Sequence, residues 1–270
     1  MAYLDTGSGR IYYEHHAGDK LPVLLIHAWA MSTRVWDSTL VALQDAGHEV
    51  IAFDQRGCGR SDKDFADFSI SALADDAVRL VDELGLHRVV VNGWSLGGAV
   101  ATQCAHRLSD RCAGLVLTCG ASPRYTQADG FPYGGTADDV RGTVAAINPD
   151  RATFFHGIAR AVCAKPVSEA TLDWMWSIFM QAAPGADRSL GELATVDQRD
   201  ILAGLDVPVL CYEGSEDAFV APGIGEFAAQ TAQDGRVVKM EGVGHGPMFE
   251  DYQRYCSELI GFLADLESAP

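Results

Sequence analysis

The sequence predicts an α/β fold, with a mostly parallel doubly wound sheet and a helical segment inserted before the last two strands. Two observations support this fold class. Short continuous apolar runs alternate with helical patterns up to residue 119 and again from residue 205, and such runs are typical of parallel strands covered on both faces. Residues 120–204 instead show only helical patterns. We therefore expect a core formed by residues 1–119 and 205–270, with a helical cap at 120–204.

Composition and charge limit the partners. The chain has 270 residues, 48% hydrophobic and 21% charged, which is enough to bury one sizeable core. Its formal net charge of −17 argues against nucleic acid and anionic membrane surfaces, because both would be repelled. No basic N-terminal region precedes an apolar run, and the longest apolar stretch, 21–31, is too short to span a bilayer. We expect a cytoplasmic protein with a small-molecule partner, and a homodimer is left open.

The cysteines predict no metal site. There are seven of them, an odd number, at positions without metal-ligand spacing and mostly in apolar strand or helix contexts. Reduced, buried thiols are the expected state. No sequence feature indicates a metal ion or a cofactor.

The first half of the chain alternates strands and helices. Residues 9–15 alternate loosely and predict an antiparallel strand at an edge of the sheet. The later apolar runs predict buried parallel strands, and amphipathic patterns between them predict helices. The expected strands are 21–26, 49–54, 88–94 and 113–118, and the expected helices are 35–46, 71–84 and a segment from residue 96 to about 108.

The second half contains the cap and the end of the sheet. The cap helices are expected at 138–147, 151–163, 168–182 and 190–193. Strands at 207–212 and 236–240 and helices at 224–232 and 249–266 complete the core. Ligands of such folds bind outside the carboxyl ends of the strands, so the cap is expected to cover the ligand crevice.

One motif marks the candidate nucleophile. Gly93-Trp94-Ser95-Leu96-Gly97 follows an apolar strand and precedes a helix-forming run. A serine on so sharp a turn exposes its hydroxyl above the sheet, at the N-terminus of the next helix. The two glycines are needed because a Cβ at either position would press on the neighbouring strand and helix. Ser95 is therefore the candidate nucleophile.

The serine requires a base and an acid further along the chain. On this kind of sheet the order is serine, acid, histidine, and His245 is the one histidine after residue 156. It lies in a glycine-rich loop after the last strand. Asp217 lies about five residues past the preceding strand and is the best-placed acid, with Glu213 and Glu216 as weaker alternatives.

These residue types fit acyl transfer. A serine hydroxyl is a poor nucleophile until a base takes its proton, the role given to His245. Asp217 would fix the imidazole tautomer and stabilise the imidazolium. The backbone N–H groups of Leu96 and Trp29 are expected to hold the oxyanion of the tetrahedral intermediate.

Two further segments resemble motifs of a known family. His27-Ala28-Trp29 resembles the oxyanion loop of α/β-hydrolases, and residues 54–62 resemble their Asp-x-Arg-Gly-x-Gly-x-Ser segment. The chain is therefore identified as similar to the serine branch of the α/β-hydrolase superfamily, in particular to its cofactor-free haloperoxidases and perhydrolases. Ala28 stands where that family usually has glycine. We expect the 54–62 loop and His27 to have structural roles, with His27 orienting its own loop.

Acyl transfer to water by these residues, together with the aromatic and methionine content of the cap, predicts hydrolysis of a carboxylic ester or lactone with a small hydrophobic group. Dehalogenases and epoxide hydrolases of this superfamily carry an aspartate at the nucleophile position, so Ser95 argues against both. The expected pocket residues are Trp29, Trp94, Trp176, Phe179, Phe219 and Met248.

Other activities of the same fold stay open. They are perhydrolysis or haloperoxidation, slow single-turnover hydrolysis by a ligand-sensing receptor, and C–C bond hydrolysis of a β-diketone-like substrate. The last would need a polar cap group to hold a carboxylate, and five basic residues are available: Arg124, Arg141, Arg151, Arg160 and Lys165.

Overall fold

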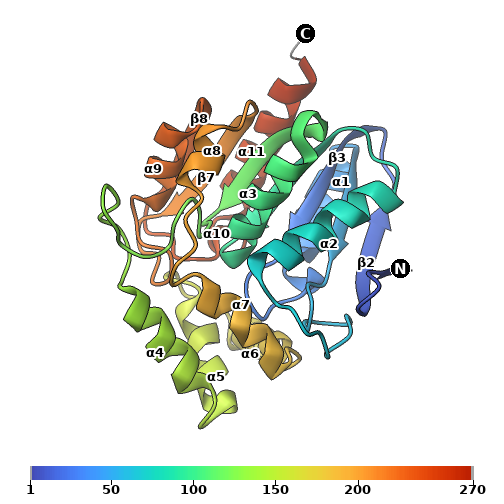
Figure 1. Ribbon diagram of the computed structural model, residues 1–270. Coiled ribbons are helices and arrows are strands. Elements are labelled where there is room, and N and C mark those ends of the chain that lie inside the picture. Colours follow the sequence, from blue (N-terminus) through green and yellow to red (C-terminus); the bar gives the residue numbers. More distant parts are fainter. Residues whose placement is uncertain (1, 269–270) are drawn as a thin grey trace.

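The computed structural model, which describes residues 2–268, is a single eight-stranded sheet flanked by helices (Figure 1). The strand order is β1-β2-β4-β3-β5-β6-β7-β8. β1 and β2 pair antiparallel with their neighbours and all later pairs are parallel, which confirms the predicted fold class. The strands are β1 (Ala2–Asp5), β2 (Arg10–His16), β3 (Lys20–Ile26), β4 (His48–Phe53), β5 (Val89–Trp94), β6 (Cys112–Thr118), β7 (Pro208–Gly214) and β8 (Asp234–Met240).

Helices cover both faces of the sheet and form the cap. The α-helices are α1 (Asp37–Asp45), α2 (Ile70–Glu83), α3 (Leu96–Leu108), α4 (Ala137–Ile147), α5 (Arg151–Ala161), α6 (Glu169–Phe179), α7 (Asp187–Glu192), α8 (Arg199–Ala203), α9 (Ile224–Thr231), α10 (Pro247–Glu250) and α11 (Tyr252–Ser268). Three short 3-10 helices are η1 (Thr33–Trp36), η2 (Ser109–Arg111) and η3 (Pro184–Ala186). No helix of the described residues is long and apolar enough to cross a membrane.

The central strands are buried because their apolar runs face helices on both sides. Every residue of β5 and β6 is buried, as are the last four residues of β3. Burial of both faces explains why these strands read as continuous apolar runs without alternation. The predicted positions of these strands are confirmed to within one or two residues.

Four elements differ from the sequence prediction. The strand expected at the edge, β2, is the second strand of the sheet, because the four-residue β1 pairs outside it. Only Leu4 of β1 is buried, so this strand gives almost no hydrophobic signal. The C-terminal helix is two helices, since the chain leaves helical geometry at Asp251 with φ −144°. Helix α8 was not predicted.

The inserted segment forms a separate layer. Figure 1 shows α4, α5, α6 and α7 grouped together at one end of the sheet, in yellow-green to ochre. In contrast, α8 contacts α3 and α9, which are helices of the core. The division of the chain at residues 119/120 and 204/205 stays a prediction, and the packing of α8 places the last residues of the insertion beside the core.

All seven cysteines are free thiols. Six are buried and Cys163 is half-buried. Burial raises the pKa of Cys58, Cys112 and Cys163 to about 12, so these thiols stay protonated near neutral pH. A thiol must ionise and be reachable to react, and neither condition holds for the buried ones.

We therefore predict that Ellman's reagent at pH 8 labels no more than one thiol per chain quickly in the folded protein. Labelling after denaturation in guanidinium chloride should reach all seven. The variant Cys163→Ser should remove any labelling seen in the folded protein, because Cys163 is the one thiol that is not fully buried. Rapid labelling of several thiols in the folded state would contradict the observed burial.

Candidate active site

Ser95 lies on a strained turn between β5 and α3. Its backbone has φ 56° and ψ −123°, a conformation that a non-glycine residue adopts only when its surroundings enforce it. The surroundings do so through hydrogen bonds. The Ser95 N–H donates to the Thr118 carbonyl at 3.1 Å, and the Ser95 carbonyl accepts from the N–H groups of Gly98 and Ala121, both at 2.8 Å. The side chain is partly exposed, unlike its buried neighbours on both sides.

The glycines beside the serine are required by close packing, as the sequence predicted. A Cβ on Gly93 would lie 2.1 Å from the carbonyl oxygen of Gly97 in α3. A Cβ on Gly97 would lie 2.5 Å from the carbonyl oxygen of Ile26 in β3. Both contacts are with backbone, which cannot yield. The strand and helix therefore approach closely enough to hold the turn at Ser95 only because these two side chains are absent.

His245 and Asp217 form a buried pair at the carboxyl ends of β8 and β7. The imidazole Nδ1 lies 2.8 Å from Asp217 Oδ2. The other carboxylate oxygen accepts hydrogen bonds from the backbone N–H groups of Phe219 at 2.8 Å and Val220 at 2.9 Å. Both side chains are buried. These contacts fix the carboxylate and with it the orientation of the imidazole ring.

The alternative acids do not reach the imidazole. Glu216 is exposed, and Glu213 accepts a hydrogen bond at 3.0 Å from the N–H of Glu226 at the start of α9. Asp217 is therefore the acid that pairs with His245, and of the three carboxylates it was the preferred one in the sequence prediction.

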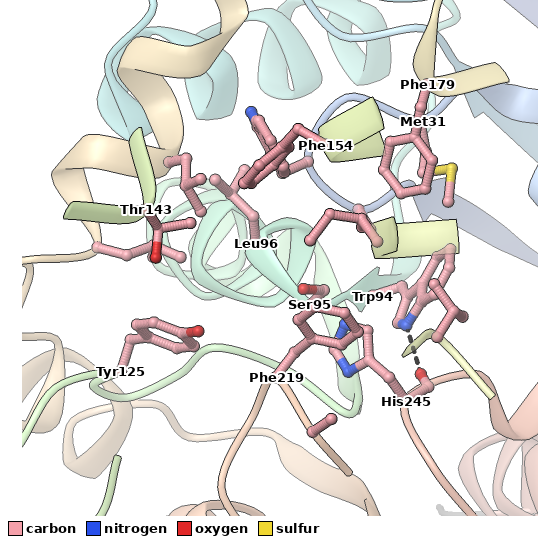
Figure 2. Close-up of a pocket in the computed structure, with 17 residues that line it drawn as sticks. Met31, Trp94, Ser95, Leu96, Tyr125, Thr143, Phe154, Phe179, Phe219 and His245 are labelled. Atoms are coloured by element: carbon pink, nitrogen blue, oxygen red, sulfur yellow. Dashed lines mark hydrogen bonds between the residues drawn. The ribbon is translucent and has the colours of Figure 1, made fainter. Parts of the chain in front are cut away.

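Ser95 and His245 line one cavity of about 390 Å³ below the cap. Figure 2 shows the serine hydroxyl and the imidazole at the same wall. No hydrogen bond joins them in the described residues. Such bonds are commonly long in enzymes without substrate and tighten in the complex. The full lining is Ala28, Trp29, Met31, Trp94, Ser95, Leu96, Tyr125, Thr143, Phe154, Ile158, Val162, Phe179, Leu190, Leu193, Ala218, Phe219 and His245.

The two expected oxyanion donors also lie at this cavity. Leu96 is the first residue of α3, where N–H groups have no partner within the helix. Within residues 2–268, no acceptor is found for the backbone N–H of Leu96 or of Trp29. The Ala28 carbonyl accepts from His27 Nδ1 at 2.7 Å and from the Met31 N–H at 3.2 Å. In a trans peptide the N–H points opposite to the carbonyl, so the Trp29 N–H is directed away from these contacts.

His27 orients this loop, as the sequence analysis expected. Its Nε2 accepts a hydrogen bond from the Gln55 N–H at 2.9 Å, which leaves the proton on Nδ1 for the Ala28 carbonyl. Complete burial lowers the pKa of His27, and the imidazole therefore stays neutral near pH 7. A neutral ring is the form that can donate on one side and accept on the other.

The 54–62 loop is held by structural contacts. The Asp54 carboxylate accepts from the N–H groups of Thr33 at 2.6 Å and Arg60 at 2.7 Å. Arg56 Nη2 donates to Asp76 at 2.8 Å, in a buried ion pair with α2. None of these side chains lines the cavity, in agreement with the structural role predicted from the sequence.

Four of the six expected pocket residues line the cavity, namely Trp29, Trp94, Phe179 and Phe219. The other two do not, which corrects the prediction. Trp176 donates its indole N–H to the Ala152 carbonyl of α5 at 3.1 Å and is not among the residues that line the cavity. Met248 is buried in α10, with 2% of its surface exposed.

Sequence reasoning missed the wall that α5 contributes. Phe154, Ile158 and Val162 follow one another at intervals of four residues and all face the cavity. Their spacing marks one face of a helix and was visible in the sequence. What the sequence lacked was any sign of which face of α5 turns toward the serine.

Comparison with known proteins gives the family. The sequence model of the alpha/beta hydrolase fold family matches residues 22–252, and the chain belongs to that family. A non-heme haloperoxidase from Rhodococcus erythropolis is 29% identical, over 97% of this chain and 94% of its own. A bifunctional esterase/perhydrolase from Acinetobacter calcoaceticus is 26% identical, over 97% of this chain and 99% of its own. The structure of an esterase from Exiguobacterium antarcticum matches with a TM-score of 0.91 at 26% identity, over 96% of this chain and 97% of the esterase chain.

Glu250 ties the histidine loop to the cap, a contact that no sequence motif predicted. Its carboxylate accepts hydrogen bonds from four backbone N–H groups. Two belong to the linker between α5 and α6, Ala164 and Lys165, both at 2.8 Å. The others belong to Gly244 at 3.0 Å and Gly246 at 3.3 Å, on either side of the histidine.

The cap also binds the histidine loop directly, because the His245 N–H donates to the Val162 carbonyl at 2.8 Å. Val162 follows the last residue of α5 and lines the cavity. The position of the imidazole therefore depends on the end of α5, through this bond and through the Glu250 carboxylate.

We predict that Glu250→Gln lowers kcat for ester hydrolysis about tenfold and lowers Tm by roughly 5 °C. An amide offers one acceptor oxygen and turns an NH₂ group toward backbone donors, so charge-assisted hydrogen bonds are weakened or lost, at a net cost of about 2 kcal/mol. Steady-state kinetics and thermal unfolding would measure both effects.

Asp251→Asn is the matched control, since its long, partly exposed ion pair with Lys165 at 3.9 Å should contribute little. If Glu250→Gln lowers Tm but leaves kcat unchanged, the carboxylate supports the fold without positioning His245.

Proposed function

We propose that this protein is a serine hydrolase that cleaves carboxylic esters of small, uncharged, largely apolar substrates through an acyl-enzyme. One observation carries the proposal: a serine on an enforced, strained turn shares a cavity with an imidazole that a buried carboxylate holds at 2.8 Å. The esterase-named relatives support hydrolysis of esters in general.

In the proposed reaction the Ser95 hydroxyl attacks the ester carbonyl while Nε2 of His245 takes its proton. Asp217 keeps the proton of the neutral ring on Nδ1 and leaves Nε2 free for this task. The N–H groups of Leu96 and Trp29 stabilise the oxyanion. The imidazolium then protonates the departing alcohol. A water molecule, activated by the same imidazole, releases the acid and restores Ser95.

The cavity supports an apolar, uncharged substrate. Its walls are mainly aliphatic and aromatic, and no lysine or arginine of the described residues lines it. All five basic residues considered for holding a carboxylate are engaged elsewhere: Arg124 with Asp197, Arg141 with Asp138, Arg151 with Asp187, Arg160 with Glu169 and Lys165 with Asp251. This arrangement disfavours C–C bond hydrolysis of a substrate that carries a carboxylate. It is compatible with a lactone as well as an open ester.

Perhydrolysis is a second candidate activity, favoured by the haloperoxidase and perhydrolase names of the relatives. Hydrogen peroxide would replace water as the nucleophile that attacks the acyl-enzyme. The carbonyl–Oγ bond would break, a peracid would leave, and the proton would return to Ser95. The step needs no group beyond those already described.

We predict that the protein turns over p-nitrophenyl butyrate many times per chain and that Ser95→Ala abolishes this activity. Removal of the hydroxyl leaves no atom to form the acyl-enzyme. Release of p-nitrophenol, followed by absorbance, measures it. A burst of one equivalent followed by no further release would instead indicate a ligand-sensing receptor.

We predict that His245→Ala lowers kcat by about 10³-fold or more and that Asp217→Asn also causes a large loss, because the residues of such a group act as a unit. The weaker acid candidates supply the control: Glu216→Gln should keep near-normal activity. A His245→Ala variant with a tenth of the normal rate would mean that another base serves Ser95.

A further inference from the structure

The hydroxyl of Tyr125 points into the cavity. Tyr125 lies in the segment between β6 and α4 and lines the same cavity as Ser95. Figure 2 shows its ring at the end of the cavity away from His245, with the hydroxyl directed across the space toward Ser95. The group is therefore placed to meet a part of the substrate other than the reacting carbonyl.

This hydroxyl makes no hydrogen bond to any atom of residues 2–268. The residue itself is partly buried and packs against the hydrophobic core. Only four side chains that line the cavity carry a hydroxyl or an imidazole: Ser95, Tyr125, Thr143 and His245. Ser95 and His245 belong to the proposed chemistry, and Thr143 already donates its proton to the Asp139 carbonyl at 2.9 Å. Tyr125 is thus the free hydroxyl donor of the cavity outside the proposed machinery.

The protonation state of Tyr125 is fixed. Burial, and next the negative charge of Asp217, raise the pKa of Tyr125 to about 12. The phenol therefore keeps its proton throughout the pH range in which an esterase is assayed. A phenol is a better hydrogen-bond donor than acceptor, because the ring withdraws electron density from its oxygen.

We propose that Tyr125 is a specificity-determining residue, which donates a hydrogen bond to an uncharged acceptor oxygen on the substrate, remote from the scissile ester. Keto, ether and amide oxygens belong to this class. The inference rests on the proposed function and names its substrate class more closely. An anionic acceptor is disfavoured, because none of the described residues that line the cavity is a lysine or arginine and the negative charge of Asp217 acts on Tyr125.

The selectivity follows from the cost of burying a hydroxyl without a partner. An alkyl chain that fills the cavity displaces water from the Tyr125 hydroxyl and gives it no acceptor in return. A chain of the same size with an oxygen at that point restores the hydrogen bond. Sites that hydrogen-bond a substrate group discriminate strongly against the analogue that lacks the group.

The test compares matched esters in the wild-type protein and in Tyr125→Phe, which removes one oxygen atom. On the acyl side the pair is p-nitrophenyl pentanoate and p-nitrophenyl 4-oxopentanoate. On the alcohol side it is pentyl acetate and 4-oxopentyl acetate, followed by acid release at constant pH. In one of the two pairs, kcat/KM of the wild type should be higher for the oxo ester. Tyr125→Phe should lower kcat/KM for that oxo ester about tenfold and should change kcat/KM for the plain ester less than twofold.

Tyr133→Phe is the matched control. Tyr133 lies in the same segment but packs against Phe131 and Phe227 and does not line the cavity, so its variant should keep the wild-type preference. If Tyr125→Phe changes kcat/KM by the same factor for the oxo and the plain ester in both pairs, the proposed role of Tyr125 is overturned. Ser95-dependent hydrolysis of the plain esters would still uphold the proposed function. If the wild type hydrolyses none of the four esters, the proposed function fails and this inference fails with it.

Discussion

The strained backbone at Ser95 is the constraint on which the rest of the site depends. A residue at φ 56° and ψ −123° costs on the order of 1–3 kcal/mol, and the fold must hold it there. It does so with hydrogen bonds to both backbone polar groups of the serine and with the tight contact of β5, β3 and α3. That contact exists because Gly93 and Gly97 have no side chains. The proposed nucleophile is thus positioned by the packing of the sheet rather than by neighbours in a loop.

The parallel sheet brings the remaining groups to the same edge. β5, β7 and β8 run in the same direction, so the residues that follow them, Ser95, Asp217 and His245, emerge together at their carboxyl ends. The cap then completes the arrangement from above. Its helix α5 contributes a wall of the cavity, and the residues that follow α5 bind the histidine loop, Val162 directly and the next linker residues through Glu250. The same part of the cap therefore shapes the cavity and holds the loop of His245.

The parts of the molecule that were predictable are those in which chemistry or burial restricts the choice of residue. Buried parallel strands need continuous apolar runs, and the turn at Ser95 needs glycine on both sides. Both features could therefore be predicted from the sequence. Short or surface elements carry no such restriction. β1 has one buried residue, and the break at Asp251 interrupts a pattern that is otherwise helical. Glu250 contacts backbone N–H groups, which every residue except proline has, so the sequence gives no sign of these contacts.

The pocket was the least predictable part, because hydrophobic periodicity shows that a helix has an apolar face without showing what that face covers. Trp176 and Phe154 illustrate this: both are aromatic residues of cap helices, yet only Phe154 faces the cavity. The polar groups of the pocket follow a different logic. In an apolar cavity each hydroxyl or imidazole must find a partner in the protein or in the ligand, and Tyr125 has none among the described residues. A polar group left without a partner at such a place is information about the ligand, and the Tyr125 hydroxyl supports the proposed acceptor oxygen at a distance from the ester.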